Sequence, residues 1–175
     1  MQALPETKRL FLREWTMQDL DAWAAILSDA EVMRYYPKPF DRQNVQDWIA
    51  WNLENYRMDG FSLWAVHLRA TGELLGDCGI TMQQLPEIGF HMKKSVWGQG
   101  YATEAARACL MWGMQQTDFP AFDYYQKSTN LPSRRVVERL GMTLQEIDTD
   151  PVNTFTSVYA ITRAEFFAET QNAPL

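Results

Sequence analysis

Two glycines at the start of a helical stretch are the residues whose type and spacing most clearly indicate chemistry. Gly98 and Gly100 directly precede the segment 102–116, which is predicted to be a helix. A glycine turn that opens into a helix leaves the first backbone N–H groups unpaired, with the positive end of the helix dipole behind them. Glycine has no side chain, so a phosphate can approach this backbone closely. The turn therefore predicts an anion-binding site, although a tight strand-to-helix connection alone would have the same pattern.

The two standard nucleotide-binding motifs do not fit this turn. A P-loop ends in Gly-Lys-Ser or Gly-Lys-Thr, and neither follows here. The dinucleotide fingerprint needs a third glycine, but Thr103 stands at that position. That fingerprint also follows the first strand of its unit, whereas four predicted strands precede this turn. A nucleotide site of either standard kind is therefore not expected.

A second segment, 130–142, extends the pattern. Together with the glycine turn it resembles the GNAT family of N-acetyltransferases, and more narrowly the branch of ribosomal-protein N-terminal acetyltransferases. The matching pieces are Glu87-Ile-Gly-Phe, Trp97-Gly-Gln-Gly-Tyr-Ala-Thr-Glu-Ala, Asn130-x-x-Ser133-x-x-Val136 and Leu140-Gly141. The segments 9–13 and 159–163 resemble the ends of the family, so the likeness covers nearly the whole chain.

The resemblance implies acetyl-coenzyme A as co-substrate, with no metal. In the family, the glycine turn holds the pyrophosphate through backbone amides, and the preceding strand pairs its free backbone with the pantetheine arm. Asn130 would contact the cofactor, although asparagine is also a common N-cap. Either Arg134 or Arg135 would reach its phosphates, unless both are simply solvated. The implied binding residues are Phe90, His91, Met92, Gly98, Gln99, Gly100, Tyr101, Ala102, Thr103, Asn130 and Arg135.

Acetyl transfer to an amine benefits from a base that removes a proton from the amine. Glu87 is the first candidate, because it begins the strand implied to line the cofactor. His91 lies on the same strand face by the period of two and is the alternate. An exposed carboxylate at a strand end and a structural histidine are the ordinary alternatives for these two residues.

The acid that protonates the departing thiolate is harder to assign. Many family members have a tyrosine four residues after the position of Ser133, but this chain has Val137 there. The ribosomal-type branch suggests Ser133 itself as the proton donor. Tyr124 and Tyr125, on the adjacent predicted strand, are further candidates.

Aromatic residues in the loop between the first two helices could contact the acceptor. Met33, Tyr35 and Tyr36 precede Pro37 there, and an aromatic wall suits an apolar chain that ends in an amine. The alternative is that they only pack the loop against the core. We expect transfer to a primary amine by direct attack in a ternary complex. A protein N-terminal α-amino group, a small amine (an antibiotic, a polyamine or an amino-acid derivative) and a non-catalytic acyl-coenzyme A sensor all remain open.

The elements that position these residues follow from hydrophobic periodicity and turn signals. Strands are expected at 9–13, 61–68, 74–82, 87–92, 122–126, 143–147 and 155–161. Helices are expected after Thr16 and Asp41 as N-caps, at 102–116 and at 130–140, the last one ending at Gly141. This order predicts an α+β fold with a mixed, mostly antiparallel, twisted sheet and helices on both faces. No linker interrupts it, so one domain is expected over 1–175, with its core at about 8–165.

Composition excludes several classes of protein. Of the 175 residues, 46% are hydrophobic and 22% charged, which is typical of a globular domain rather than a disordered chain. The net charge of −6 disfavours a nucleic-acid partner and favours a cationic amine. Cys78 and Cys109 have no paired spacing and are expected to be reduced thiols. No apolar run reaches the ~20 residues that span a bilayer, and the N-terminus is too polar for a signal peptide. A cytoplasmic monomer or homodimer without a membrane partner is expected.

Overall fold

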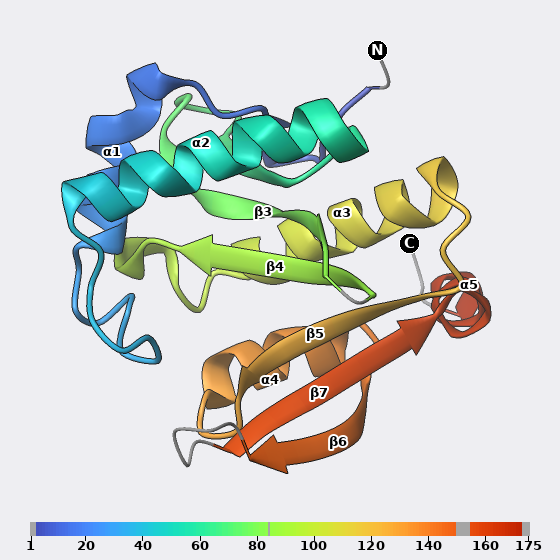
Figure 1. The fold of residues 1–175 in the computed structure, drawn as a ribbon. Helices are drawn as coiled ribbons and strands as arrows, with labels where there is room; N and C mark the ends of the chain where they lie inside the picture. The colour runs from blue at the N-terminus through green and yellow to red at the C-terminus, as the bar shows by residue number, and fades with distance from the viewer. Residues whose placement is uncertain (1–2, 84, 150–154, 173–175) are drawn as a thin grey trace.

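The computed structural model describes residues 3–83, 85–149 and 155–172. These residues form one seven-stranded sheet and five α-helices (Figure 1). The strands are β1 (Leu10–Arg13), β2 (Leu63–Leu68), β3 (Leu74–Met82), β4 (Pro86–Met92), β5 (Ala121–Lys127), β6 (Thr143–Thr149) and β7 (Phe155–Thr162). The helices are α1 (Leu20–Leu27), α2 (Arg42–Asp59), α3 (Tyr101–Gln116), α4 (Leu131–Arg139) and α5 (Arg163–Asn172). Two short 3-10 turns, η1 (Met17–Asp19) and η2 (Lys94–Val96), complete the described elements.

The sheet has one parallel junction in an otherwise antiparallel arrangement. Its order is β1-β2-β3-β4-β5-β7-β6, and only β4 and β5 run parallel. These two strands share a single residue pair, Glu87 with Asp123, and then separate toward their carboxyl ends (Figure 1). The expected fold class is confirmed, and this junction determines where a site can form.

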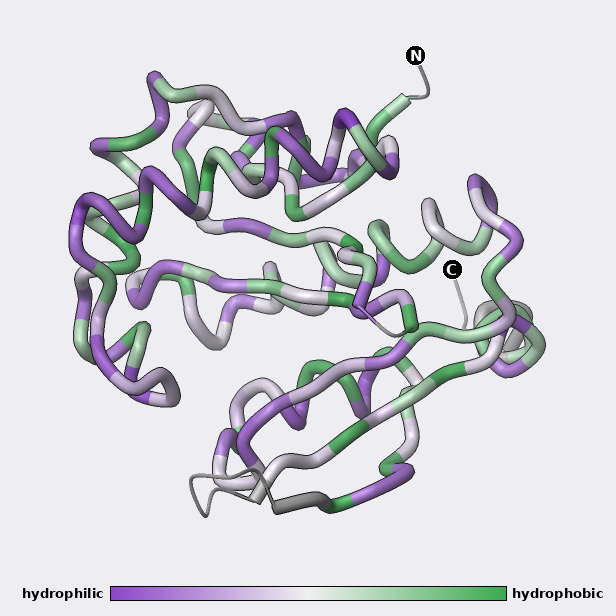
Figure 2. The backbone as a smooth tube through the Cα atoms, in the orientation of Figure 1, coloured by the Kyte–Doolittle hydropathy of each residue, from purple (hydrophilic) through white to green (hydrophobic). Residues whose placement is uncertain are grey.

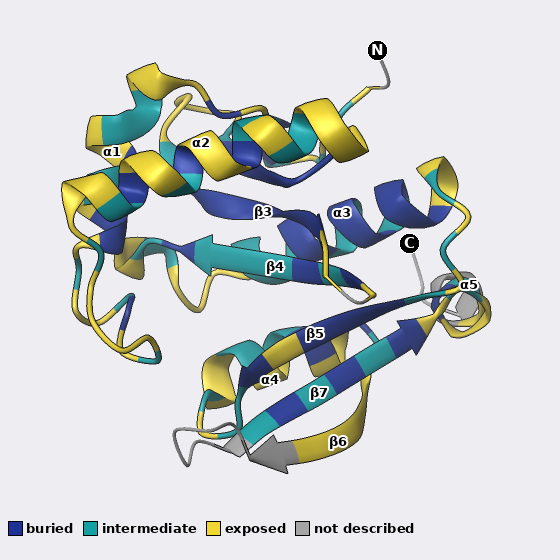
Figure 3. Cartoon of the chain, viewed as in Figure 1, coloured by how far each residue is buried: buried dark blue, intermediate teal, exposed yellow. Residues whose placement is uncertain are grey.

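Two hydrophobic cores cover the two faces of the sheet. The core under α1 and α2 contains Trp15, Trp23, Ile26, Leu27, Met33, Val45 and Ile49. The core under α3 and α4 contains Ala105, Ala106, Cys109, Leu110, Val137 and Leu140. Strand β2 serves both, since Ala65 joins the first core while Trp64 and Val66 join the second. Figure 3 shows β3 largely buried, β4 mostly intermediate and the outer surface of α2 exposed, and Figure 2 shows that hydrophilic residues dominate this outer surface.

The predicted helix ends agree with the structure. Asp41 caps α2 by accepting a hydrogen bond from the Asn44 backbone N–H (2.9 Å). Thr16 and Asp19 form the expected capping box, but the first turn is the 3-10 turn η1, and α1 begins only at Leu20. Gly141 follows α4 with φ of 84°, a left-handed conformation that favours glycine.

One helix is absent from the sequence-based prediction, which ended the chain in two strands. Helix α5 follows β7 directly. Its large apolar residues, Phe166 and Phe167, are adjacent rather than three or four positions apart, so no helical stripe marks the segment. Phe166 is 1% exposed in the core, Phe167 packs against it, and Arg163 donates to the carbonyl oxygens of Thr117 (2.5 Å) and Phe119 (3.1 Å). These contacts are tertiary and leave no periodic pattern in the sequence.

The junction between α2 and β2 depends on one buried amide. Asn52 is fully buried, and its Oδ1 accepts hydrogen bonds from Ser62 Oγ (2.7 Å) and the Leu63 backbone N–H (3.0 Å). Its Nδ2 donates to the carbonyl oxygen of Trp48 at 2.9 Å. Every polar atom of this side chain therefore connects the helix to itself or to the adjoining strand.

Replacing this amide should destabilise the protein strongly. Asn52→Ala leaves the Leu63 N–H buried and unpaired, so we expect a loss of about 2–4 kcal/mol in the free energy of unfolding. Asn55→Ala is the matched control, because Asn55 is half-buried and makes one longer bond to Ser62 (3.2 Å). Urea denaturation measures both variants. Equal losses for the two would contradict this assignment.

Candidate active site

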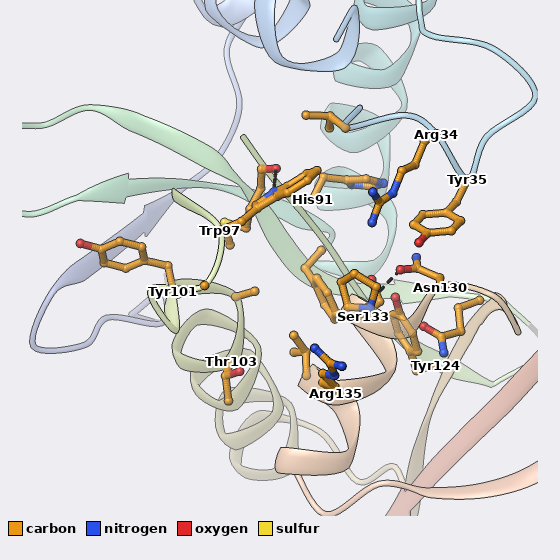
Figure 4. Close-up of a pocket in the computed structure, with 18 of the residues that line it drawn as sticks. Arg34, Tyr35, His91, Trp97, Tyr101, Thr103, Tyr124, Asn130, Ser133 and Arg135 are labelled. Carbon is orange, nitrogen blue, oxygen red and sulfur yellow. Dashed lines mark hydrogen bonds between the residues drawn. The ribbon is translucent and has the colours of Figure 1, made fainter. Parts of the chain in front are cut away.

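A cavity of about 570 Å³ opens where β4 and β5 separate. Four segments form its walls: the loop between α1 and α2, the end of β4 with the turn that follows, the end of β5, and the start of α4. Figure 4 shows side chains from all four converging, with Arg34 and Tyr35 on the side opposite Thr103 and Arg135. The splayed strands thus create a space that segments distant in sequence can reach.

The glycine turn lies on the wall formed by the N-terminus of α3. Gly98 and Gly100 have φ of 74° and 81°, and Gly100 is the N-cap of the helix. No atom lies within 4 Å of the position that a Cβ on Gly98 would take. The first N–H groups of α3 have no partner inside the helix, so they are available to an anion. This turn can hold a phosphate against bare backbone.

Arg9, the residue directly before strand β1, braces the glycine turn. Arg9 Nη1 donates to the carbonyl oxygen of Gln99 (3.1 Å), and Arg9 Nε donates to Glu104 Oε2 (2.6 Å). The same guanidinium lies over the Tyr101 ring, 4.3 Å from its centroid. Fixing the Gln99 carbonyl fixes the orientation of the peptide group that enters the helix. Arg9 therefore holds the turn in one conformation.

Asn130, Ser133 and Tyr124 lie together on the opposite wall (Figure 4). Asn130 Oδ1 accepts a hydrogen bond from the Ser133 N–H (3.3 Å), so Asn130 caps α4 while also lining the cavity. Tyr124 is buried and stacks on Phe90, with ring centroids 5.2 Å apart and an interplanar angle of 6°. Burial raises the pKa of Tyr124, and the neighbouring Ser133 side chain only partly offsets this, so the phenol stays protonated.

Glu87 lies where β4 and β5 still pair, outside the wall of the cavity. Burial is the main cause that raises the pKa of Glu87 to about 7, and the nearby Asp123 carboxylate adds to the rise. A hydrogen bond from the Tyr125 backbone and the charge of His91 both lower the pKa of Glu87 and partly offset this rise. A carboxyl group with this pKa exchanges a proton near neutral pH.

His91 is held between two polar partners. Its Nδ1 lies 2.8 Å from Asp77 Oδ1, and its Nε2 lies 2.6 Å from the Tyr36 hydroxyl oxygen. Burial of the imidazole opposes protonation, but Tyr36 and the Asp77 carboxylate more than offset it and raise the pKa of His91 to about 10. His91 is therefore an imidazolium at neutral pH rather than a free base.

Comparisons with known proteins agree with this geometry. A family model described as an acetyltransferase (GNAT) domain matches residues 9–143. The uncharacterized protein YkkB of Bacillus subtilis (strain 168) is 38% identical over 144 residues, which cover 78% of this chain and 83% of YkkB. The chain belongs to the GNAT acetyltransferase family.

Solved GNAT structures share the fold. A GNAT-family acetyltransferase from Bacillus anthracis superposes with a TM-score of 0.82 and 25% sequence identity, covering 92% of this chain and 99% of the other. RimL, a ribosomal L7/L12 α-N-protein acetyltransferase solved with coenzyme A, has a TM-score of 0.77 at 15% identity, covering 92% and 97%. The second likeness shows the fold alone. As a GNAT member, this chain is an acetyl-CoA-dependent N-acetyltransferase.

Most of the predicted site residues lie on the wall of the GNAT cavity. They are Tyr35, Tyr36, Phe90, His91, Met92, Gly98, Gly100, Tyr101, Ala102, Thr103, Asn130, Ser133 and Arg135. Three predicted residues do not line it. Gln99 turns its side chain to the Ser95 carbonyl oxygen (3.1 Å), Glu87 lies at the strand junction, and Met33 is only 1% exposed in the core under α1 and α2. The packing alternative therefore fits Met33, and a substrate contact from it has no support in this placement.

The structure also separates the two arginines of α4. Arg134 forms an ion pair with Glu138 along the helix (2.7 Å), whereas Arg135 lines the cavity. Two residues that matter to the site were not predicted. Arg9 and Asp77 were expected only as strand residues, because each reaches the site through tertiary contacts that no local motif marks.

The described residues contain neither a cluster of metal-ligating side chains nor a membrane-spanning helix. Within residues 3–83, 85–149 and 155–172, no group of three His, Cys, Asp or Glu side chains is placed to hold a metal ion. No helix among these described elements is long and apolar enough to cross a membrane.

The glycine turn gives a matched test. Gly98→Ala and Gly72→Ala both place a side chain at φ of 74° with no atom within 4 Å, so each should cost about 1–2 kcal/mol of stability. Only Gly98→Ala alters the phosphate-binding turn, and we expect it to weaken coenzyme A binding about tenfold, a loss of ~1.4 kcal/mol. Isothermal titration calorimetry measures the affinities. Equal affinities in the two variants would show that the turn does not contact the ligand.

Proposed function

We propose that this GNAT enzyme transfers the acetyl group of acetyl-coenzyme A to a primary amine by direct attack in a ternary complex. The observation that carries the proposal is the open glycine turn at the N-terminus of α3, beside a cavity between separated strands. Bound acetyl-coenzyme A supplies an acetyl group activated as a thioester. The cavity faces of α3, β4 and α4 present the residues that would hold it, namely Phe90, Met92, Gly98, Gly100, Tyr101, Ala102, Thr103, Asn130 and Arg135.

In this proposal Glu87 is the general base. Its pKa of about 7 suits a group that must accept a proton at neutral pH and release it again. Because Glu87 does not line the cavity, it would act through a water molecule. His91, the alternate base, is already protonated at neutral pH and therefore cannot accept a proton from the amine.

Ser133 and Tyr124 are the proposed proton donors to the departing sulfur. The position that often carries a tyrosine in the family is occupied by Val137, which is fully buried in the core. Tyr124 instead reaches the cavity from β5, beside Ser133. The buried phenol keeps its proton at neutral pH, so it is the group from which a proton would pass through the serine hydroxyl to the departing sulfur; the raised pKa makes it a weak acid, which suits a relay only as the thiolate forms.

The pKa of the acceptor amine favours one class of acceptor. An α-amino group has a pKa near ~8, against ~10.4 for lysine, so it reaches the nucleophilic form more easily. RimL, which shares the fold, is named as a ribosomal L7/L12 α-N-protein acetyltransferase. A protein N-terminus is therefore the first acceptor to test, with small amines as the alternative. The cytoplasmic location, the oligomeric state and the single-domain boundaries stay predictions.

One assay tests the function as a whole. Thiol release from acetyl-coenzyme A is measured with a panel of peptides bearing free N-termini and with small amines, in the presence of the full chain. Stimulation by any amine supports the enzyme. Tight coenzyme A binding with no turnover on any amine of the panel would favour a sensor and contradict the proposal.

The pH profile identifies the base. A base must be deprotonated to act, so kcat/KM should fall as the pH drops through about 7 in the wild type, following Glu87. In Glu87→Gln this limb disappears, and only the rise that belongs to the amine itself remains. Glu146→Gln, at an exposed position on β6, is the control. An unchanged limb in Glu87→Gln would exclude Glu87 as the base.

The proton donors can be tested as a pair. Ser133→Ala and Tyr124→Phe should each lower kcat by about 10²-fold, because both residues lie on the same path of proton transfer to the sulfur. Combining them should add little, since residues that act in sequence are not additive. Thermal unfolding checks that the variants fold. Multiplication of the two effects in the double variant would show that they act independently.

A further inference from the structure

A chain of hydrogen bonds runs from the interior of the sheet to the wall of the cavity. Asp77 on β3 is fully buried and lies directly opposite His91 on β4. Its Oδ1 accepts a hydrogen bond from the His91 backbone N–H (2.9 Å) and lies 2.8 Å from the imidazole Nδ1. Trp48 Nε1 donates to its Oδ2 (3.3 Å). At the other end, His91 Nε2 meets the Tyr36 hydroxyl at 2.6 Å. Tyr36 is 37% exposed and lines the cavity.

Aromatic rings fix the imidazole in this position. Trp48 and Trp23 meet His91 edge-on, with centroids 5.5 and 6.4 Å away, and the Tyr36 ring is tilted against it at 5.6 Å. The titratable groups that act on His91 are Asp77 from β3, Tyr36 from the α1–α2 loop and Glu87 from its own strand, while α1 and α2 present only the two indoles. In the described part of the chain, His91 is the only cation in contact with Asp77.

The direction of each hydrogen bond follows from the buried charge. A carboxylate with no exposed surface needs a cationic partner, which keeps His91 in the imidazolium form. Both ring nitrogens then donate, Nδ1 to Asp77 and Nε2 to the Tyr36 oxygen. Because Tyr36 already accepts from His91, its own proton must be donated elsewhere. Tyr36 lines the cavity, so a molecule bound there can accept this proton.

We propose that the Asp77–His91 pair makes Tyr36 a fixed hydrogen-bond donor to the acceptor molecule, and that the enzyme thereby selects amines that carry a carbonyl oxygen close to the amine nitrogen. This inference rests on the proposed function. Tyr36 is the residue that contacts the acceptor, and Asp77 is a positioning residue that acts through His91.

Tyr36 is assigned a contact with the acceptor rather than with coenzyme A, because Tyr36 reaches the cavity from the other face of β4. His91 packs against α1 and α2, whereas Met92 and Ile88, on the other face of β4, belong to the core under α3. Tyr36 thus approaches from the face opposite the glycine turn. Its donor complements an oxygen, which polyamines and alkylamines do not carry beside the amine nitrogen. Peptide N-termini and amino-acid amides fit this arrangement, while polyamines and simple alkylamines do not.

The test compares kcat/KM for an α-amino acid amide and for an alkylamine of similar size, in the intact enzyme. Because the two amines differ in intrinsic reactivity, the quantity of interest is how their ratio changes between variants. Tyr36→Phe removes the donor, and Asp77→Asn removes the charge that fixes its direction. Trp51→Phe is the control, since Trp51 contacts Trp48 in the same aromatic group but does not contact the imidazole. We expect the ratio to fall roughly tenfold in both test variants and to stay unchanged in the control.

A spectroscopic measurement tests the direction of the hydrogen bonds at His91 independently of whether the Asp77→Asn variant folds. Nitrogen NMR of the His91 imidazole at neutral pH should show both ring nitrogens protonated in the wild type, and one of them deprotonated in Asp77→Asn. A neutral imidazole in the wild type would overturn the inference even if Asp77→Asn failed to fold. Turnover with an unchanged ratio in Tyr36→Phe would overturn this inference alone. Absence of turnover with every amine in the wild type would overturn the proposed function and the inference with it.

Discussion

Strands β4 and β5 pair through one residue each, Glu87 and Asp123, and then separate although they belong to the same sheet. Backbone groups beyond that pair lose their neighbouring strand, which a buried sheet does not tolerate unless something else fills the space. The cavity is that space, and every functional element is arranged around it. Helix α3 starts beside it, α4 closes one side, and the α1–α2 loop reaches it from the other face. The separation of the strands thus leaves backbone groups that a ligand in the cavity can pair with.

The same junction explains the unusual electrostatics of an acidic protein that binds a polyanion. The chain carries a net charge of −6, but the cavity wall contains Arg34, Lys127, Arg135 and Arg139, with the positive end of α3 beside them. Glu31 also lines this wall, and its Oε2 lies 3.8 Å from Lys94 Nζ. Two further acidic groups nearby are kept from opposing the ligand in different ways. Burial holds Glu87 partly protonated near neutral pH, and His91 neutralises Asp77. Local structure therefore reverses the field that composition alone would predict.

The parts of this molecule that were predictable from sequence are those specified by local chemistry. A left-handed turn favours glycine, so the turns at Gly98, Gly100 and Gly141 were predictable from the sequence. The start of α2 was predictable from Asp41, a residue type that commonly caps helices. The parts that were missed depend on register and on contacts between distant segments. Asp77 acquires its role only because the β3–β4 register places it opposite His91, and Arg9 because β1 lies beneath the turn. Helix α5 lacks an apolar stripe, and no local pattern shows that Met33, in the α1–α2 loop, turns its side chain into the core under α1 and α2.

The single pair between β4 and β5 has a consequence for how such a protein can evolve. Strands β1 to β4 carry the glycine turn and its brace, whereas β5 to β7 are joined to them by one backbone pair and by shared packing. Substitutions on the β6–β7 side touch few groups that hold the turn, and changes at distant, unconnected sites add independently. The sheet is continuous, yet its halves can diverge at different rates. Divergence in the β5–β7 half can therefore alter the cavity walls contributed by β5 and α4 while the glycine turn and its brace stay unchanged.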